Sequence, residues 1–504
     1  MIIDDQYYDL IIVGTGAGGG TLANKLAPTG KKILVLERGD FMPLEEQNRS
    51  NVDVFKRDRY RAPEQWYDNN GESFSPQTNY AVGGNTKIYA AALLRMRERD
   101  FEAVKHQEGV SPEWCLKYQD FEPYYTEAEQ LYKVHGKAAE DPTEPPRSAD
   151  YPYPAVDSEP KMQEVAVAIA KQGLHPATLP LTLTRQDDDP TGDSEVFGIT
   201  PALKFPNVTL KTSAKVVCLH TNSSGQTVKA VEAEVAGQSY LFSSEIVVLA
   251  CGAVNSAALL LRSRNDKHPN GLANSSDLVG RNLMRHQMSA VVQLSTTSNS
   301  GKFPRTISVN DFYWGDESFP YPMGHIENTG GLLQDVTFAE SPPILSVLAK
   351  AMPGFGLKQL AVRSIGWWVQ TEALPDPKNR VRVEGNKLYL DYTPNNIEAH
   401  DRLVHRWMEV LKAIEKNSEQ SVLPSSGIYP RSEVPIQVVA NQCGTCCFGE
   451  DPQTSVLNIN CRTHDVDNLY VVDGSFLPSS SSVSPALTIM ANALRVGEHL
   501  SQLP

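Results

Sequence analysis

The sequence predicts an α/β protein in which a parallel sheet carries an added antiparallel piece, together with a second, α+β domain built on an antiparallel sheet. Three observations support this. Residues 8–39 are typical of a strand, a helix and a second strand, residues 206–250 alternate as short strands between turns, and residues 290–400 hold short apolar and aromatic runs. A strand–helix–strand opening favours parallel pairing, because the helix returns the chain to the same end of the sheet.

The opening unit carries a glycine pattern of the Rossmann type. Residues 10–13 form a buried strand, and Gly14 and Gly16 then permit a tight turn in which no side chain blocks a pyrophosphate. Gly19 lets the following helix, expected over residues 18–26, pack closely against the strand. Unpaired N–H groups at the start of that helix, with a macrodipole worth roughly half a positive charge, favour a bound phosphate.

An acidic residue closes the same unit. Glu37 ends the second strand, at the offset where a carboxylate binds a ribose diol, and it disfavours NADP because it would repel the 2′-phosphate. A plain glycine loop is the alternative. The combined strand, helix and acid predict a dinucleotide cofactor, and therefore a redox enzyme.

Composition and charge exclude several classes of partner. The chain has 504 residues, which suits two or three domains, and its formal net charge of -14 argues against nucleic acid or an anionic membrane surface. No apolar run approaches the ~18 residues of a membrane span, and no signal peptide is expected. A cytoplasmic protein without a membrane span is the expectation.

The cysteines do not indicate a disulfide framework. Seven cysteines is an odd and sparse number for this length, which fits a reducing compartment. Cys443, Cys446 and Cys447 could suggest a metal, but no second Cys/His pair lies at ligand spacing nearby. Buried packing is favoured for this cluster, and no metal site is predicted.

Several motifs, taken in order, resemble the glucose-methanol-choline oxidoreductases. Besides the opening unit they are AVGGNTKIYAAAL, VVLACGAVNSAALLL, SSDLVGRNLMRH, LPDPKNRV, GTCCFGEDPQTSV and the closing NLYVVDGSFLPSSSSVSPALTIMANALRVGEHL. The resemblance spans nearly the whole chain. It implies a discontinuous FAD-binding domain of residues 1–150, 200–288 and 435–504, and a substrate-binding domain of residues 151–199 and 289–434.

The resemblance also assigns positions to FAD. The residues that match the loop along the flavin are Gly83, Gly84, Asn85 and Thr86. Asp473 and Gly474 match residues near the pyrophosphate and the ribityl chain, and Val216 matches a strand position beside the adenine. For Asp473 a turn or helix cap is the alternative role.

The flavin is expected to be bound non-covalently. Some members of the family attach FAD through a histidine shortly after the double glycine, and Ile88 holds that place here. The cysteine insertion that binds an iron–sulfur cluster in some relatives is missing between Leu179 and Leu203. Nothing in the sequence suggests an internal electron relay.

The expected catalytic pair departs from the family pattern at both positions. Flavin-dependent alcohol oxidation needs a base for the hydroxyl proton, and a near-neutral imidazole is the usual choice. The family places this histidine three residues before a Gly-Thr, and a His or Asn before a Pro in the final loop. These positions read Asn441 and Ser484. Both can hydrogen-bond a substrate oxygen, but neither is a useful base.

Three explanations for these departures remain open: a relocated base, a reaction that needs none, or a loss of activity. Candidates for a relocated base are His286, His325, His400 and His405. For His286 a structural role at a domain seam is the alternative, and for the last two a solvated helix face. The pair Trp367-Trp368 either lines a substrate pocket or packs in the core.

The primary prediction is an FAD-dependent oxidoreductase acting on the CH–OH group of a sugar or other alcohol, with a separate electron acceptor or O2. The alternatives are a flavoprotein of the same fold with a non-oxidative or light-driven reaction, such as decarboxylation, and a catalytically silent FAD-binding protein.

Overall fold

The computed structural model describes residues 1–43, 45–49, 53–54, 57–89, 91–183, 192–295, 305–330, 363–417, 431–438 and 441–503. The polar loop expected at 185–194 lies outside these residues up to position 191.

The larger sheet has seven strands and combines parallel and antiparallel pairing, as the sequence predicts. Its strands are β1 (Ile2–Val13), β2 (Ile33–Leu36), β11 (Val208–Lys211), β12 (Ala214–Thr221), β13 (Val228–Val235), β14 (Gln238–Leu249) and β22 (Leu469–Val471). Their order is β11-β2-β1-β14-β13-β12, with β22 paired to β14. The pairs β11–β2, β2–β1, β1–β14 and β14–β22 are parallel, whereas β12–β13 and β13–β14 are antiparallel.

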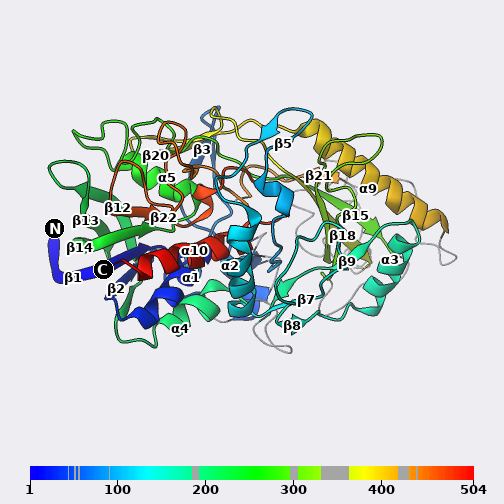
Figure 1. Cartoon of the computed structure of the whole chain (residues 1–504), viewed down its shortest axis with the longest axis horizontal. Coiled ribbons are helices and arrows are strands. Elements are labelled where there is room, and N and C mark those ends of the chain that lie inside the picture. The colour runs from blue at the N-terminus through cyan, green and yellow to red at the C-terminus, as the bar shows by residue number, and fades with distance from the viewer. Residues whose placement is uncertain are drawn as a thin grey trace.

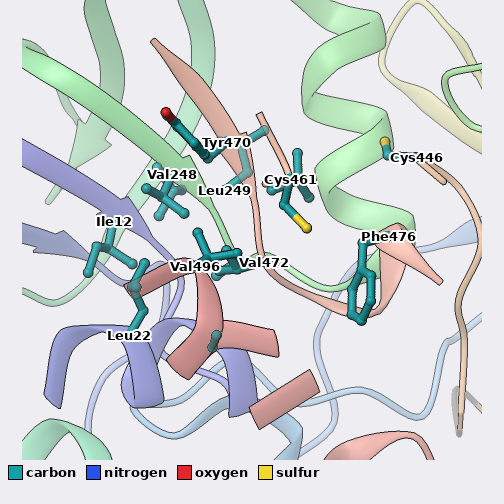
Figure 2. Close-up of a cluster of buried hydrophobic side chains, with 14 of the residues drawn as sticks. Ile12, Leu22, Val248, Leu249, Cys446, Cys461, Tyr470, Val472, Phe476 and Val496 are labelled. Atoms are coloured by element: carbon teal, nitrogen blue, oxygen red, sulfur yellow. The ribbon is translucent and has the colours of Figure 1, made fainter. Parts of the chain in front are cut away.

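Helices cover the parallel part of this sheet because its strands are apolar on both faces. All of β2 and the last four residues of β14 are buried. Helices α1 (Ala17–Leu26) and α10 (Ala486–Ser501) lie together against the strands, and α2 (Tyr118–Leu131) packs on α10 (Figure 1). Figure 2 shows Leu22 and Val496 from two of these helices meeting Ile12 and Val248 from the sheet.

The second sheet has six strands, and every pair in it is antiparallel, as expected for the substrate-binding domain. Its order is β21 (Arg431–Glu433), β15 (Gln287–Leu294), β18 (Ser364–Thr371), β17 (His325–Gly330), β16 (Ile307–Val309) and β9 (Pro176–Thr178). Helices α3 (Pro160–Ala170) and α9 (Ile397–Asn417) cover one face, at the right of Figure 1.

Small elements link the two sheets. A four-stranded sheet joins β19 (Arg380–Glu384) and β20 (Lys387–Asp391) to β3 (Trp66–Asp68) and β4 (Ser73–Phe74). The remaining elements include α5 (Ala253–Arg262), α4 (Thr200–Ala202), β5 (Val104–Lys105), β6 (Val110–Ser111), β7 (Val134–Gly136), β8 (Tyr153–Pro154) and β10 (Leu181–Thr182). Because β20 pairs with β3, residues expected in the substrate-binding domain contact residues expected in the FAD-binding domain. The domain limits stay a prediction.

Candidate active site

Four of the parallel strands end at one edge of the larger sheet, and three predicted cofactor residues, together with Gly252, which was not predicted, follow those ends. Gly14 comes directly after β1, Glu37 after β2, Gly252 shortly after β14 and Asp473 shortly after β22. Ligands of open parallel sheets bind at this carboxyl edge. The fold thus brings together residues that are far apart in the sequence.

The glycine turn is required by close backbone contacts. A Cβ atom at Gly14 would lie 2.4 Å from the carbonyl oxygen of Ala250, and one at Gly19 would lie 2.0 Å from that of Gly14. At Gly16, the N-cap of α1, a Cβ would meet nothing within 4 Å. Among the described residues no side chain caps α1, so its first N–H groups can serve as donors to an anion.

Glu37 holds two loops together. Its buried carboxylate accepts hydrogen bonds from Thr15 N (3.0 Å), Thr15 Oγ1 (2.6 Å) and Gly39 N (3.0 Å). Burial raises the pKa of Glu37, although these hydrogen bonds act in the opposite direction. Thr15 Oγ1 in turn accepts from Gly83 N at 3.0 Å, which connects the acid to the second glycine loop. The sequence did not single out Thr15.

The second glycine loop lies against the first. Gly83 and Gly84 both have positive φ angles, and a Cβ at Gly84 would lie 2.9 Å from the Cα of Gly16. Asn85 is exposed, and its Oδ1 accepts from Thr78 Oγ1 at 2.9 Å. The amide nitrogen of Asn85 therefore remains available to a ligand.

Ser194 connects the two glycine loops through hydrogen bonds, and the sequence analysis did not single it out either. Its Oγ donates to the carbonyl oxygens of Thr15 and Gly16, both at 2.9 Å. Its backbone N donates to Thr86 Oγ1 at 3.0 Å, and Thr86 Oγ1 donates to Gly83 O at 2.6 Å. Thr86 therefore shapes the loop from a buried position.

A backbone hydrogen bond ties the start of β12, which contains Val216, to Glu37. The N–H of Ala214, the first residue of β12, donates to the carbonyl oxygen of Glu37 at 2.8 Å. Val216 follows two residues later and is half-buried. This placement agrees with a position beside the adenine, which itself stays a prediction.

Asp473 caps a short helix, which is the alternative role given to it above, and it also links this helix to the loop at Gly252. Its Oδ1 accepts from Ser475 N at 2.9 Å at the start of the short helix η8 (Gly474–Phe476). Its Oδ2 accepts from Gly252 N at 3.0 Å and from Ser256 Oγ. Burial raises the pKa of this carboxyl. Its oxygens are thus occupied by protein donors, so Asp473 positions the Gly252 loop.

The nucleotide edge fits a dinucleotide such as FAD. Added Cβ atoms at Gly16 and Gly252 would meet nothing within 4 Å, so the backbone there is open to a ligand. The uncapped start of α1 supplies N–H donors for a pyrophosphate, and the exposed Asn85 supplies an amide. The individual contacts to a cofactor stay a prediction.

A run of serines fixes the loop before α10. Ser479 Oγ accepts from Trp114 Nε1 (2.8 Å), Ser480 Oγ from Ala373 N (3.1 Å) and Ser482 Oγ from Glu372 N (3.1 Å). These bonds position the half-buried Ser484 just before α10, whose N-terminus carries a partial positive charge. The serine run in the sequence was the one signal that could have revealed this anchoring.

Asn441 contacts a buried histidine. Its backbone has a φ angle of 57°, in the left-handed region that asparagine tolerates. Its Nδ2 lies 3.1 Å from His286 Nδ1 and donates to Gln370 Oε1 at 3.4 Å. The position of the family's base is therefore next to an imidazole.

The neighbours of His286 determine its tautomer. Its Nε2 lies 3.2 Å from the carbonyl oxygen of Ser480, which can only accept, so Nε2 carries the proton. Nδ1 lies 3.1 Å from the donor Asn441 Nδ2 and also 3.1 Å from the acceptor Gln370 Oε1. With the proton on Nε2, Nδ1 accepts from Asn441, and its contact with Gln370 Oε1 is not a hydrogen bond. Burial lowers the pKa of His286, because a charged imidazole is disfavoured away from water. The Ser480 contact and the lowered pKa together favour a neutral imidazole whose Nδ1 faces Asn441.

Gln370, which contacts Asn441, lies on one face of the second sheet among other polar side chains. In β18 and β17, Gln370 pairs with His325, and Trp368 pairs with Glu327, so all four share one face. Gln370 Nε2 donates to Glu327 Oε1 at 3.2 Å. The Arg305 guanidinium and the His325 imidazole hold the pKa of Glu327 at about 2 despite its burial. This face carries a buried polar cluster.

The other candidate bases lie elsewhere. His400 bonds Ser289 Oγ (2.8 Å) and Thr371 Oγ1 (3.1 Å) on the opposite face of the sheet, and it is buried rather than on a solvated helix face as expected. His405 is exposed on α9.

The two residues of the Trp367-Trp368 pair have different surroundings. Trp367 packs on Trp407 in the core, with ring centroids 4.7 Å apart, while Trp368 is half-buried on the same face of the sheet as Gln370.

The cysteine cluster is buried, in agreement with packing. Cys443 and Cys446 are fully buried, Cys447 is half-buried, and all three are free thiols. Burial raises the pKa of each of them.

The fold and this site define a two-domain oxidoreductase with a Rossmann-like nucleotide domain and an antiparallel substrate sheet. The chain belongs to the GMC oxidoreductase family, because the family's N- and C-terminal sequence models match residues 8–288 and 375–493.

Two curated relatives match this chain over more than nine-tenths of their own length. The chain is 27% identical to 6'''-hydroxyparomomycin C oxidase of Streptomyces lividus, covering 99% of this chain and 92% of that protein. It is 26% identical to 2-methyl-1,2-propanediol dehydrogenase of Mycolicibacterium austroafricanum, covering 98% and 95%. Both names describe oxidoreductases.

Solved structures confirm the fold. Pyridoxine 4-oxidase from Mesorbium loti superposes with a TM-score of 0.69 at 17% identity, over 98% of this chain and 99% of that one. Formate oxidase from Aspergillus oryzae, whose structure was studied for FAD modification, gives 0.67 at 15% identity, over 99% and 98%. In the described part of the chain, no helix has the length and apolar character needed to cross a membrane.

Proposed function

We propose that the protein is an FAD-dependent oxidoreductase that oxidises the CH–OH group of a small alcohol or sugar, with a separate electron acceptor or O2. The observation that carries this proposal is the contact between Asn441 and the neutral imidazole of His286, 3.1 Å apart. It would supply a base directly beside the position where the family expects one. The names of the relatives, which include a diol dehydrogenase and a sugar-type oxidase, support the substrate class.

The nucleotide edge would hold FAD. Gly14, Gly16 and the start of α1 would bind the pyrophosphate, Glu37 would bind the adenosine ribose, and the loop at 83–86 would lie along the flavin. When bound, FAD accepts a hydride from the substrate carbon. Because Ile88 offers no nucleophile, acid denaturation should release all the FAD into solution; flavin retained on the precipitated chain would contradict this.

His286 takes the hydroxyl proton. In the structure Asn441 donates to His286 Nδ1, and the substrate hydroxyl takes the place of that amide and gives its proton to the same nitrogen. The proton on Nε2 stays bonded to Ser480 O, which fixes the ring. A low pKa keeps Nδ1 free of a proton at neutral pH.

Asn441 and Ser484 position the substrate oxygen. The displaced amide of Asn441 donates to that oxygen, and the Ser484 hydroxyl can donate to it or accept from it. Ser484 also precedes the N-terminus of α10, whose partial positive charge stabilises negative charge developing nearby. In this proposal Asn441 and Ser484 still position the substrate oxygen, and His286 takes over the role of proton acceptor.

A reaction without a base is the second candidate. The complete burial of His286, with both nitrogens engaged by Ser480 and Asn441, favours it. In that case the fold would bind FAD and either run a light-driven reaction or none.

An anaerobic titration separates these functions. The flavin spectrum of the purified, FAD-loaded protein is recorded in the dark while alcohols and sugars are added. Bleaching of the oxidised flavin band supports the proposal, since hydride transfer removes that band. Product formed only under illumination supports the photochemical candidate, and bound FAD with no change in either condition supports a silent flavoprotein.

A further inference from the structure

A thiol, an imidazole and a carboxylate meet on the outer face of the β12–β13 pair, away from the residues discussed above. We propose that Cys218, His220 and Glu232 bind one transition-metal ion, with Zn²⁺ as the first candidate. Their ligand atoms all lie within 4.8 Å of one another. The site is independent of the proposed oxidation, and sequence spacing did not reveal it because Glu232 comes from a second strand.

The pairing register brings the three side chains to one face. Cys218 lies directly opposite Glu232, and His220 follows two residues after Cys218 on the same strand. Leu219, between them, is 1% exposed and points into the core, so both its neighbours point outward. Cys218 is half-buried and His220 exposed, which leaves room for water as a fourth ligand.

The donor set suits zinc. Thiolate, imidazole and carboxylate are its usual ligands, and tetrahedral bonds of about 2.0–2.3 Å place ligand atoms roughly 3.3–3.8 Å apart. His220 Nε2 and Glu232 Oε2 are 2.8 Å apart and must separate slightly, while the thiol must move closer. Side-chain rotations achieve both changes on a fixed pair of strands, and the Cys218 thiol releases its proton on binding.

A neighbouring hydroxyl already orients the carboxylate. Ser239 Oγ, from β14, donates to Glu232 Oε1 at 2.9 Å. This leaves Oε2 directed at His220 and at the metal position. Hydrogen bonds of this kind to the non-coordinating oxygen are a regular feature of metal sites.

The alternative is an ordinary surface ion pair. His220 and Glu232 are 46% and 19% exposed, and such pairs contribute only about 0–1 kcal/mol. An ion pair needs no thiol, however, and the presence of Cys218 within reach favours the metal. A bound ion would fasten β12 to β13 at the bulge between Val216 and Cys218.

Cobalt provides the test. The FAD-loaded protein is treated with a chelator, dialysed and titrated with Co²⁺, and the difference spectrum against the same protein without cobalt is recorded. One equivalent should bind with a thiolate-to-cobalt charge-transfer band, and Zn²⁺ should displace it. Cys218→Ser should abolish the band, and His220→Ala and Glu232→Gln should each weaken binding at least ~10-fold.

Matched controls exclude the other thiols and charges. Cys115→Ser removes another half-buried free cysteine, and Glu234→Gln removes an exposed carboxylate two residues from Glu232; both should bind cobalt normally. FAD content and the thermal midpoint verify that each variant is folded. A charge-transfer band that survives Cys218→Ser, or less than one equivalent bound by the unaltered protein, would overturn the proposal.

Discussion

The amide nitrogen of Asn441 lies 3.1 Å from Nδ1 of His286, although 155 positions separate the two residues in the sequence. This contact changes the meaning of the asparagine at the base position. An isolated asparagine there would leave the site without a proton acceptor, whereas this asparagine occupies the hydrogen-bonding position of a neutral, buried imidazole. Under the proposed function, the site therefore keeps a base one side chain away from the family's usual position.

We expect His286→Gln to lower the rate of flavin reduction by ~10²–10⁴-fold, the usual cost of removing a general base. Rapid anaerobic mixing with substrate measures this rate. His400→Gln is the matched control, because it removes a buried histidine from the opposite face of the same sheet and should leave the rate within a few-fold. Equal losses in both variants would indicate a structural role.

Asn441→His should increase the rate of flavin reduction only slightly if His286 already accepts the proton. The new imidazole would stand beside His286, and the hydroxyl would have two acceptors in place of one. A gain of ~10² or more in flavin reduction would show that the site lacks a base, and would favour the silent or photochemical alternatives for the natural chain.

The pH profile follows from the burial of His286. Its pKa lies below the ordinary value of 6.5, and only the neutral ring accepts a proton. The rate of flavin reduction should therefore be constant above pH 6.5 and fall as the pH drops through the lowered pKa. The same shift contributes stability that is present above pH 6.5 and lost as the pH falls through the folded-state pKa. In His286→Gln this limb should disappear; an unchanged limb would assign it to another group.

The sequence predicts the framework well because the framework depends on local patterns. The strand expected over residues 10–13 lies within β1 (Ile2–Val13), and the helix expected over residues 18–26 is α1 (Ala17–Leu26). Gly14 and Glu37 could be placed because each directly follows a buried strand, and parallel strands end at one edge.

The hydrogen bonds that connect the residues of the site could not be predicted from local sequence patterns. Besides Asn441, His286 contacts Gln370, 84 positions away, and Ser480, 194 positions away. No periodicity connects such residues, since their contact depends on how the second sheet meets the first. Thr15 and Ser194 were missed for the same reason: each acts through loops brought together only by the fold.

Thr15→Val should weaken FAD retention. The substitution removes the hydroxyl that donates to Glu37 and accepts from Gly83 N, and it leaves two buried polar groups without that partner. Each such group costs about 1–3 kcal/mol, so both glycine loops should loosen. FAD remaining after dialysis measures the effect. Thr29→Val, on the periphery of the same domain, is the control; equal retention in the two variants would contradict the role given to Thr15.

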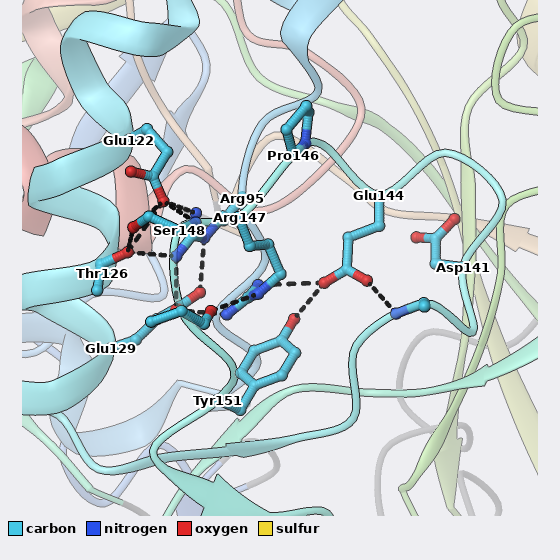
Figure 3. A network of polar contacts seen from close by, with 12 residues as sticks. Arg95, Glu122, Thr126, Glu129, Asp141, Glu144, Pro146, Arg147, Ser148 and Tyr151 are labelled. Atoms are coloured by element: carbon cyan, nitrogen blue, oxygen red, sulfur yellow. Dashed lines mark hydrogen bonds and ion pairs between the residues drawn. The ribbon is translucent and has the colours of Figure 1, made fainter.

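The buried charges in Figure 3 give the last prediction. Arg95 and Arg147 both bind Glu129, at 2.8 and 2.6 Å, and all three side chains are at most 7% exposed. Glu129→Gln leaves two buried cations undercompensated, so we expect about 3–5 kcal/mol of destabilisation and a lower thermal midpoint. Glu113→Gln breaks a pair with Lys117 that is more than half exposed and should cost at most ~1 kcal/mol. Arg95 closely follows the loop at 83–86, which is proposed to lie along the flavin, so FAD should also dissociate at a lower temperature from Glu129→Gln. A midpoint shift no larger than that of Glu113→Gln would mean that the cluster is not a support of the fold.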